Sequence, residues 1–447
     1  MTRICLALPT NRACSPALTA LHAEARYAAE HFGAEVRLLV LDSADDRTRA
    51  EHARALDALD PAEGVTVHHL GEDLQRDFLR RTIQRSGHPE PERLLRLLLP
   101  DGVSYGSCTD RVFLLASALG CDSVHRRDSD SRYQLHHGAP VFPVHHELPW
   151  LGRPAADAMA AVPHEGLEPV LAGRPVSLAG ASFIGELSVD ISDMRRRDES
   201  VYHDVVGLWA APGTSAEERR ALVEESFTGA GTTPFTGDHV TLGLVDPMRV
   251  DMCNIAFHRD VYESVPLPPA TDTIGSDYFL LHLVHDAGLP GILHNRHIEN
   301  FHTPERRTDA GFTAYQTRFV KFLLSMLYFH HVYARMAAEG PALLDGRGAP
   351  GTGGAVRPER IVEFLRESTA LDTAENEWRL DRIDTAYRKL GGRYAALADQ
   401  LASQRDQLIA EARQDIEDHA LLVAAWPALV EAARHTVPAS GTPGGGR

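Results

Sequence analysis

Two aspartates, Asp128 and Asp130, are the residues whose type and spacing point most directly to chemistry. They stand in the sequence HRRDSDS, directly after Cys121–His125, a short segment that can form a strand. Carboxylates at positions i and i+2 of a turn can both reach one hard divalent cation, which prefers oxygen ligands and can in turn hold a diphosphate. An acidic turn can equally be a solvated loop or a helix cap, so the pair must be judged with its neighbours.

The segment before the acidic pair predicts a buried helix. Residues 112–119 form an apolar run, VFLLASAL, and Gly120 follows at a position typical of a helix end. The polar sequence YGSCTDR leads into this run and carries Arg111. The order is therefore helix, short strand and acidic turn.

Composition bounds the class of protein. With 447 residues, 43% of them hydrophobic, the chain can bury a full core and form two or three domains. A net charge of −17 argues against an extended nucleic-acid surface, which needs a basic stripe. Its five cysteines are scattered without a Cys-x-x-Cys pair, which favours reduced thiols. No run of eighteen apolar residues occurs, so we expect no membrane span and a cytoplasmic location.

The N-terminal third alternates apolar runs with helical patterns, which indicates a parallel sheet covered by helices on both faces. The runs are Ile4–Leu8, Val36–Leu41 and Gly64–Leu70. Ligands of such sheets bind beyond the carboxyl ends of the strands. We therefore expect the loops that carry Thr10, Asp42 and Asp128 to meet at one edge.

The motifs ALPTNR, VLDSADD, YGSCTDR and HRRDSDS, in this order, resemble glycosyltransferases of the GT-A fold, especially the large inverting family that includes chitin and cellulose synthases. The resemblance covers roughly residues 4–302. It implies an α/β fold of the nucleotide-diphospho-sugar transferase type, Rossmann-like, with a mixed sheet between helices. It also implies a metal-dependent enzyme, using Mn²⁺ or Mg²⁺, that moves a sugar from a nucleoside-diphosphate sugar to a hydroxyl or amine of a small-molecule or peptide acceptor.

The same resemblance assigns roles to residues of the donor site. It suggests that the first loop lies near the base and ribose and that Asp42 contacts one of them. Arg111 corresponds to the basic residue before the metal turn, and Asp128 and Asp130 bind the metal and thereby the donor. The residues of the first loop are Pro9, Thr10, Asn11 and Arg12.

Each of these assignments has a structural alternative. Thr10 and Asn11 could cap the helix that follows them. Asp42 could be a favourable charge at a helix N-terminus. Arg111 could pair with Asp110 or a nearby glutamate on the surface.

The catalytic base that the resemblance implies is Asp277, in the sequence IGSDYF at the start of a helix. A carboxylate can deprotonate an acceptor hydroxyl if partial burial raises its pKa and the hydroxyl is within hydrogen-bond reach. The alternative is that Asp277 only caps its helix. The related enzymes often carry two adjacent acids here, whereas this chain has Ser276 and Asp277.

A third metal ligand is expected downstream of the base. Several GT-A enzymes supply a histidine there, and His302 is the candidate, with His297 as the alternative. Manganese accepts mixed oxygen and nitrogen ligands. A histidine that forms ordinary hydrogen bonds is the competing interpretation.

The domain plan follows from composition. Residues 1–340 form the predicted catalytic domain, 341–357 a linker rich in glycine and proline, 358–436 a C-terminal helical region and 437–447 a disordered tail. The helical region carries an apolar stripe interrupted at Gly391 and Gly392, which favours a hairpin. The stripe is expected to pack within the chain, although it could also form a homodimer.

Two other functions remain compatible with the sequence. A nucleotidyltransferase could use the same fold, but it would be expected to carry a glycine-rich, basic first loop where this chain has ALPTNR. A transferase fold without activity could serve as a binding or scaffold protein through its helical tail. The sequence itself does not identify the sugar, the base or the acceptor.

Overall fold

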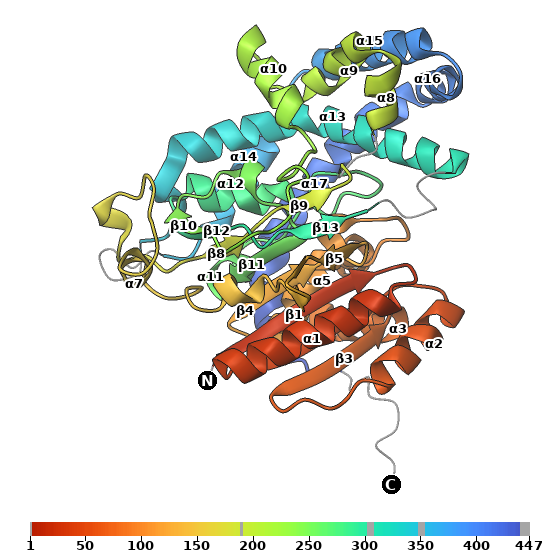
Figure 1. Cartoon of the computed structure of the whole chain (residues 1–447). Coiled ribbons are helices and arrows are strands. Elements are labelled where there is room, and N and C mark those ends of the chain that lie inside the picture. Colours follow the sequence, from red (N-terminus) through yellow and green to blue (C-terminus); the bar gives the residue numbers. More distant parts are fainter. Residues whose placement is uncertain (1, 188–190, 302–307, 347–353, 439–447) are drawn as a thin grey trace.

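An eight-stranded sheet forms the centre of the molecule (Figure 1). The computed structural model describes residues 2–187, 191–301, 308–346 and 354–438. In spatial order the strands are β10 (Val240–Gly243), β12 (Gly291–His294), β8 (Leu178–Gly180), β11 (Asn254–His258), β4 (Ser123–Arg127), β1 (Arg3–Thr10), β2 (Glu35–Asp42) and β3 (Val65–Gly71). Within these residues β10 and β11 run opposite to the other strands of the sheet.

Alternation of side chains along β1 shows how the sheet is covered. Ile4, Leu6 and Leu8 pack toward one face, whereas Cys5 and Ala7 pack toward the other. The first face is covered by α1 (Ser15–Phe32) and α2 (Asp46–Asp57). The second is covered by α3 (Glu72–Ser86), α4 (Pro91–Leu98), α5 (Tyr105–Ala118), α12 (Tyr278–Asp286) and α13 (Asp309–Glu339). The expected fold class, a mixed sheet with helices on both faces and C-terminal helices, is confirmed.

Smaller elements frame the acidic turn and the edge of the sheet. A three-stranded sheet is formed by β5 (Ser131–Tyr133), β13 (Ile298–Asn300) and β9 (Phe183–Gly185). A hairpin is formed by β6 (Leu135–His136) and β7 (Ala139–Pro140). Short helices are α6 (Val144–Glu147), α7 (Ala155–Met159), α8 (Ser192–Arg197), α9 (Glu199–Val206), α10 (Ala216–Glu225), α11 (Arg259–Tyr262), η1 (Pro169–Leu171), η2 (Gly207–Trp209) and η3 (Pro247–Arg249).

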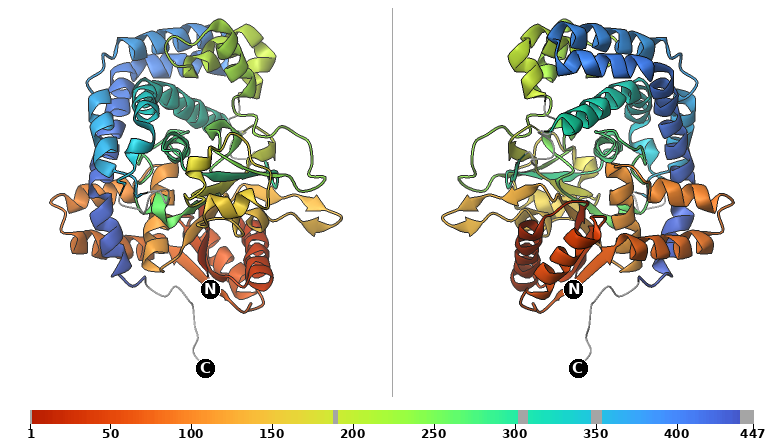
Figure 2. Two further views of the ribbon diagram at one scale, coloured as in Figure 1. Left: turned by 90° about the vertical axis from the view of Figure 1, so that its left-hand side faces the viewer. Right: turned by 90° about the vertical axis from the view of Figure 1, so that its right-hand side faces the viewer.

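The C-terminal helices share the core of the sheet domain. They are η5 (Gly340–Leu343), α14 (Pro358–Ser368), α15 (Ala374–Leu390), α16 (Arg393–Ser403) and α17 (Arg405–Arg434). Gly391 and Gly392 both have positive φ, and α15 and α16 pack together on either side of them. The long helix α17 returns past α14 and α13 to α3 and α5 (Figure 2). Its Trp426 is fully buried and donates to the carbonyl of Tyr262 at 3.1 Å.

Two of the predicted segments fall partly outside the described residues: 347–353 of the linker and 439–447 of the tail. Among the helices that the structure describes, each is either too short or too polar to cross a bilayer.

A buried ionic network fixes β4 against α1. The guanidinium of Arg127 donates to both carboxylate oxygens of Glu24, at 2.9 and 3.1 Å, and to Glu147 at 2.9 Å. Glu147 also pairs with Nδ1 of His125 at 2.6 Å, and its pKa is held well below the usual range although burial opposes this, because Arg127 and His125 stabilise the carboxylate. One arginine therefore neutralises two glutamates that have no access to water.

We expect Arg127→Met to lower the free energy of unfolding by about 3–5 kcal/mol, because it leaves Glu24 and Glu147 buried without their cation. Equilibrium urea denaturation at pH 7.5 measures this change. The matched control is Arg132→Met on β5, where the side chain is 65% exposed and its guanidinium pairs with Glu299; its change should stay below about 1 kcal/mol. Equal effects of the two substitutions would contradict the buried network.

Candidate active site

The two arginines of β4 point to opposite faces of the sheet, as alternation along a strand requires. Arg127 lies in the buried network toward α1, whereas Arg126 lies on the other face. Asp128 and Asp130 follow the strand directly, and the hydroxyl of Ser131 closes the turn by donating to the carbonyl of Asp128 at 2.9 Å. The strand therefore ends with Arg126 against the acidic turn.

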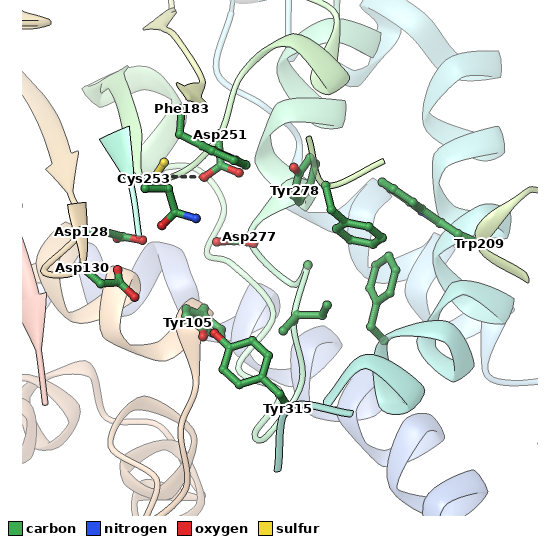
Figure 3. A pocket seen from close by; sticks show the side chains of 15 residues that line it. Tyr105, Asp128, Asp130, Phe183, Trp209, Asp251, Cys253, Asp277, Tyr278 and Tyr315 are labelled. Carbon is green, nitrogen blue, oxygen red and sulfur yellow. Dashed lines mark hydrogen bonds between the residues drawn. The ribbon is translucent and has the colours of Figure 1, made fainter. Parts of the chain in front are cut away.

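Asp128 and Asp130 line one pocket together with Asp277 (Figure 3). The pocket encloses about 770 Å³, part of it open to solvent. A fourth carboxylate, Asp251, lies in the loop before β11, and it accepts a hydrogen bond from the backbone N–H of Cys253 at 2.9 Å. The aromatic residues of the lining are Tyr105, Phe183, Trp209, Phe227, Tyr278, Tyr315 and Phe322.

Arg126 joins the acidic turn to Asp277. Its Nη2 lies 2.9 Å from Oδ1 of Asp128, and its Nη1 lies 3.6 Å from Oδ2 of Asp277. Nη1 also donates to the carbonyl of Met252 at 3.1 Å. From the first loop, Nη1 of Arg12 donates to Oδ2 of Asp130 at 2.8 Å. The structure thus brings Arg12 to the acidic turn.

Burial raises the pKa values of three carboxyls in this pocket, those of Asp128, Asp251 and Asp277. For Asp128, burial is opposed by Arg126 and reinforced by the charges of Asp130 and Asp277. Burial raises the pKa of Asp277 to about 6, with Arg126 acting against it, and burial also raises the pKa of Asp251. A carboxyl that titrates near pH 6 is suited to accept a proton at neutral pH.

Asp277 stands immediately before α12, but its side chain makes no capping hydrogen bond to that helix. Its carboxylate faces the pocket and Arg126 instead. The alternative interpretation, in which the Asp277 side chain only caps α12, is therefore wrong.

The acidic side of the pocket fits a divalent cation. Four carboxylates are among the described lining residues and neither lysine nor arginine is, although Arg12 and Arg126 pair with the acids. Ionisation of all four acids leaves excess negative charge, and carboxylate oxygens are the ligands that Mg²⁺ and Mn²⁺ prefer. Asp128 and Asp130 are the residues that would hold the ion.

The predicted third ligand, His302, lies outside the described residues. The alternative, His297, accepts a hydrogen bond from the backbone N–H of Ser182 through Nδ1 at 3.1 Å. Burial lowers the pKa of His297 to about 4. His297 is not among the residues that line the pocket. Its observed contact is the ordinary hydrogen bond to Ser182, which is the competing interpretation given above.

Within the part of the chain that the structure describes, two other clusters contain side chains of metal-binding type: Asp42 with His52 and His69, and His145 with His146 and Asp238. In the second cluster Arg296 makes a two-pronged ion pair with Asp238, at 2.6 and 2.9 Å. Asp238 is thus already paired with a guanidinium, as Asp128 and Asp130 are with Arg126 and Arg12, so this pairing does not distinguish the two sites.

The Asp42 cluster is a closed hydrogen-bond network. Asp42 is fully buried, and its Oδ2 lies 2.8 Å from Nδ1 of His52 and 2.8 Å from Nε2 of His69. The backbone N–H of Cys14 donates to Nε2 of His52 at 3.0 Å, so in the neutral ring the proton is on Nδ1 and points to Asp42. His52 is therefore a donor to Asp42, and neither nitrogen of the His52 ring has a lone pair left for a metal.

Asp42 thus lies at the predicted edge of the sheet, beside Thr10 in the register of β1 and β2, but its carboxylate does not reach the pocket. It is not a helix-terminal charge either, because α2 begins at Asp46 and is capped by Asp45. Direct contact with a base or ribose is not supported by this arrangement. Its observed role is to tie the first loop to β3.

Arg111 also stays away from the pocket. Its buried guanidinium donates to the side chain of Gln75 at 2.9 Å and to the carbonyl of Leu98 at 2.6 Å. Arg111 is not among the lining residues of the pocket, and Asp110 accepts from the backbone N–H of Leu267 at 2.8 Å instead of pairing with Arg111 on the surface. Arg111 instead fixes α5 to α3 and α4.

The remaining first-loop residues take different positions. Pro9 is partly buried near the end of β1, Thr10 after it is buried, and Asn11 is exposed. The hydroxyl of Thr10 donates to the carbonyl of Arg12 at 3.1 Å. Helix α1 is capped at Cys14 without a side-chain hydrogen bond, so Thr10 and Asn11 do not cap it.

Arg126, Asp251 and the aromatic lining were not singled out from the sequence. Asp251 precedes the MCNIAFH segment, and only the antiparallel pairing of β11 with β4 brings its loop opposite the acidic turn. The pattern of apolar and polar residues within one segment does not predict the pairing of β11 with β4. The arginine before Asp128 was visible in HRRDSDS, and strand alternation could have indicated which of the two arginines faces the pocket.

The fold and pocket define a mixed α/β protein with an acidic, partly aromatic pocket at one edge of its sheet. Residues 2–442 match a family of unknown function (DUF6271), and the chain belongs to this family. No curated protein matches the chain. One solved structure with similarity to it is the mannosyltransferase PcManGT from Pyrobaculum calidifontis in complex with GDP-Man and Mn²⁺, at 14% identity and a TM-score of 0.32, covering 94% of this chain and 86% of that one.

Proposed function

We propose that this protein is a divalent-metal-dependent glycosyltransferase that moves a sugar from a nucleoside-diphosphate sugar to a hydroxyl or amine of a small-molecule or peptide acceptor. The observation that carries the proposal is the pocket shared by Asp128, Asp130 and Asp277. Metal-type carboxylates and a carboxyl with a pKa of about 6 are the two groups that such a transfer needs.

Each group has a distinct role in the proposed reaction. Asp128 and Asp130 would hold Mn²⁺ or Mg²⁺, and the ion would supply positive charge near the departing diphosphate. Asp277 accepts the proton of the acceptor hydroxyl. The oxygen then attacks the anomeric carbon from the side opposite the diphosphate, the bond to the diphosphate breaks, and the configuration inverts.

Arg126 positions both acids in this scheme. Its contacts with Asp128 and Asp277 hold the metal ligand and the base in fixed relation, and its charge limits how far burial raises their pKa values. Arg12 holds Asp130 in place through a similar ion pair. Neither arginine is assigned a bond to the donor.

The test is a thermal-shift screen of nucleoside-diphosphate sugars with UDP, GDP, TDP or CDP, with and without Mn²⁺, followed by product analysis. We expect one donor to raise the melting temperature only when Mn²⁺ is present, and its turnover to release nucleoside diphosphate. Release of pyrophosphate from a nucleoside triphosphate would indicate nucleotidyl transfer instead. No metal-dependent shift with any donor would overturn the proposal.

A further inference from the structure

The side of the pocket away from the acidic turn is an aromatic wall, which we define as Trp209, Phe227 and Phe322. The rings of Trp209 and Phe227 are stacked, with centroids 5.3 Å apart and planes inclined by 27°. Phe322 on α13 meets Trp209 edge to face, also at 5.3 Å. Three segments far apart in the sequence, η2, the turn after α10 and α13, therefore contribute to one surface.

The backbone around the aromatic wall is specialised for close contact. Gly275 has a φ of +71°, and a Cβ there would lie 2.6 Å from the ring of Phe322. Phe227 itself has a φ of +64°, a left-handed conformation that a non-glycine residue adopts at a cost of about 1 kcal/mol. Such conformations persist where the surrounding structure requires them, and they concentrate at functional sites.

The chemistry of the aromatic wall differs from that of the acidic side. Phe227 and Phe322 offer only carbon, and Trp209 adds one indole N–H. Burial and the nearby charge of Asp251 raise the pKa of the neighbouring Tyr278 hydroxyl. A peptide, or a sugar whose hydroxyls face the wall, would leave several hydroxyl or amide groups without partners, at a cost for each. A flat apolar ring loses no hydrogen bonds and gains stacking.

Asp277 lies between the two sides, with the acidic turn on one side and Trp209 on the other (Figure 3). A hydroxyl within reach of Asp277 therefore belongs to a molecule whose remainder can extend over the aromatic wall. The position of Asp277 next to the aromatic wall therefore narrows the classes of acceptor that the proposed function leaves open.

We infer that the acceptor is a small molecule with a flat, apolar aromatic ring system that carries the reacting hydroxyl, and that the ring binds against Trp209, Phe227 and Phe322. The inference deepens the proposed function and rests on it for the transfer step. Binding of the ring does not require the metal or the donor.

The test measures binding and transfer separately. Naphthol and hydroxycoumarin are titrated by calorimetry into the full-length protein, with maltose and a serine-containing tripeptide for comparison. We expect only the two aromatic probes to bind, and Trp209→Leu to weaken them by about tenfold or more. Trp209→Phe, which keeps a flat ring, should retain most of the affinity. Trp378→Leu, at a side chain on α15 that is 48% exposed, is the matched control.

The outcomes distinguish the inference from the proposed function. Asp128→Asn should abolish metal-dependent donor binding and leave the affinity for naphthol unchanged. If no donor binds but naphthol binds and depends on Trp209, the transferase proposal fails and the aromatic site stands. If a donor is used but sugar goes to maltose or the peptide, or if Trp209→Leu leaves probe affinity unchanged in a normally folded protein, the inference is overturned.

Discussion

Replacing either aspartate of the acidic turn, by Asp128→Asn or Asp130→Asn, is expected to lower kcat/KM for sugar transfer by about a thousandfold or more. Each substitution keeps the size of the side chain and removes one anionic oxygen ligand. Binding of Mn²⁺ should weaken in parallel, because a neutral amide is a poorer ligand for a hard cation. Electron paramagnetic resonance of free Mn²⁺ measures this binding without any need for an acceptor.

The control for both variants is Asp399→Asn, at a carboxylate on α16 that is 72% exposed and pairs with Arg388. It removes the same charge from the chain and should leave Mn²⁺ binding and turnover unchanged. Near wild-type rates in both Asp128→Asn and Asp130→Asn would remove the metal from the mechanism. Wild-type Mn²⁺ affinity with lost activity would instead assign these acids to the donor or acceptor.

The sequence could predict which loops meet at one edge of the sheet, because this depends only on the direction of the strands. Apolar runs separated by helices imply parallel strands, and Thr10 is indeed paired with Asp42 in the register of β1 and β2. The direction of the Asp42 side chain could not be predicted in the same way. Val36, Leu38 and Val40 pack toward α1, so the two-residue period turns Asp42 to that same face, where His52 and His69 enclose it.

The aromatic wall and Asp251 could not be predicted from the sequence as parts of the pocket, for a different reason. Trp209, Phe227 and Asp251 come from loops and a short helix, whereas Phe322 lies on the long helix α13, and only tertiary contacts bring these residues to the acidic turn. Trp209 reaches Phe322 across 113 residues of chain. For Arg111 the sequence motif was visible, but it predicted the wrong neighbours. The guanidinium joins α5 to α3 and α4 through Gln75 and Leu98.

The second large effect is expected for Asp277→Asn. An amide cannot accept the acceptor proton, so kcat should fall by about a hundredfold to ten-thousandfold while donor affinity stays within a few fold of the wild type. The rate of the wild-type enzyme should rise with pH through a midpoint near 6, where Asp277 loses its proton. The residual activity of Asp277→Asn should not show this titration.

Stability gives an independent readout of the same carboxyl. Burial raises the pKa of Asp277 from 3.8 to about 6, so the folded protein binds this proton more tightly than the unfolded chain does. The stabilising contribution is therefore fully present below about pH 4 and is lost as the pH rises through 6. At pH 7.5 the wild-type protein carries a buried charge at this position, and Asp277→Asn does not.

We therefore expect Asp277→Asn to increase the free energy of unfolding at pH 7.5 by about 1–3 kcal/mol, the lower end reflecting the lost contact with Arg126. Near pH 4, where Asp277 is already protonated, the gain should largely disappear. Urea denaturation at the two pH values measures both numbers, with Asp399→Asn as the control. A catalytic base is thus recognised by a substitution that costs activity and adds stability. If Asp277→Asn is instead destabilising at pH 7.5, the carboxylate serves to neutralise Arg126 and the assignment as a base fails.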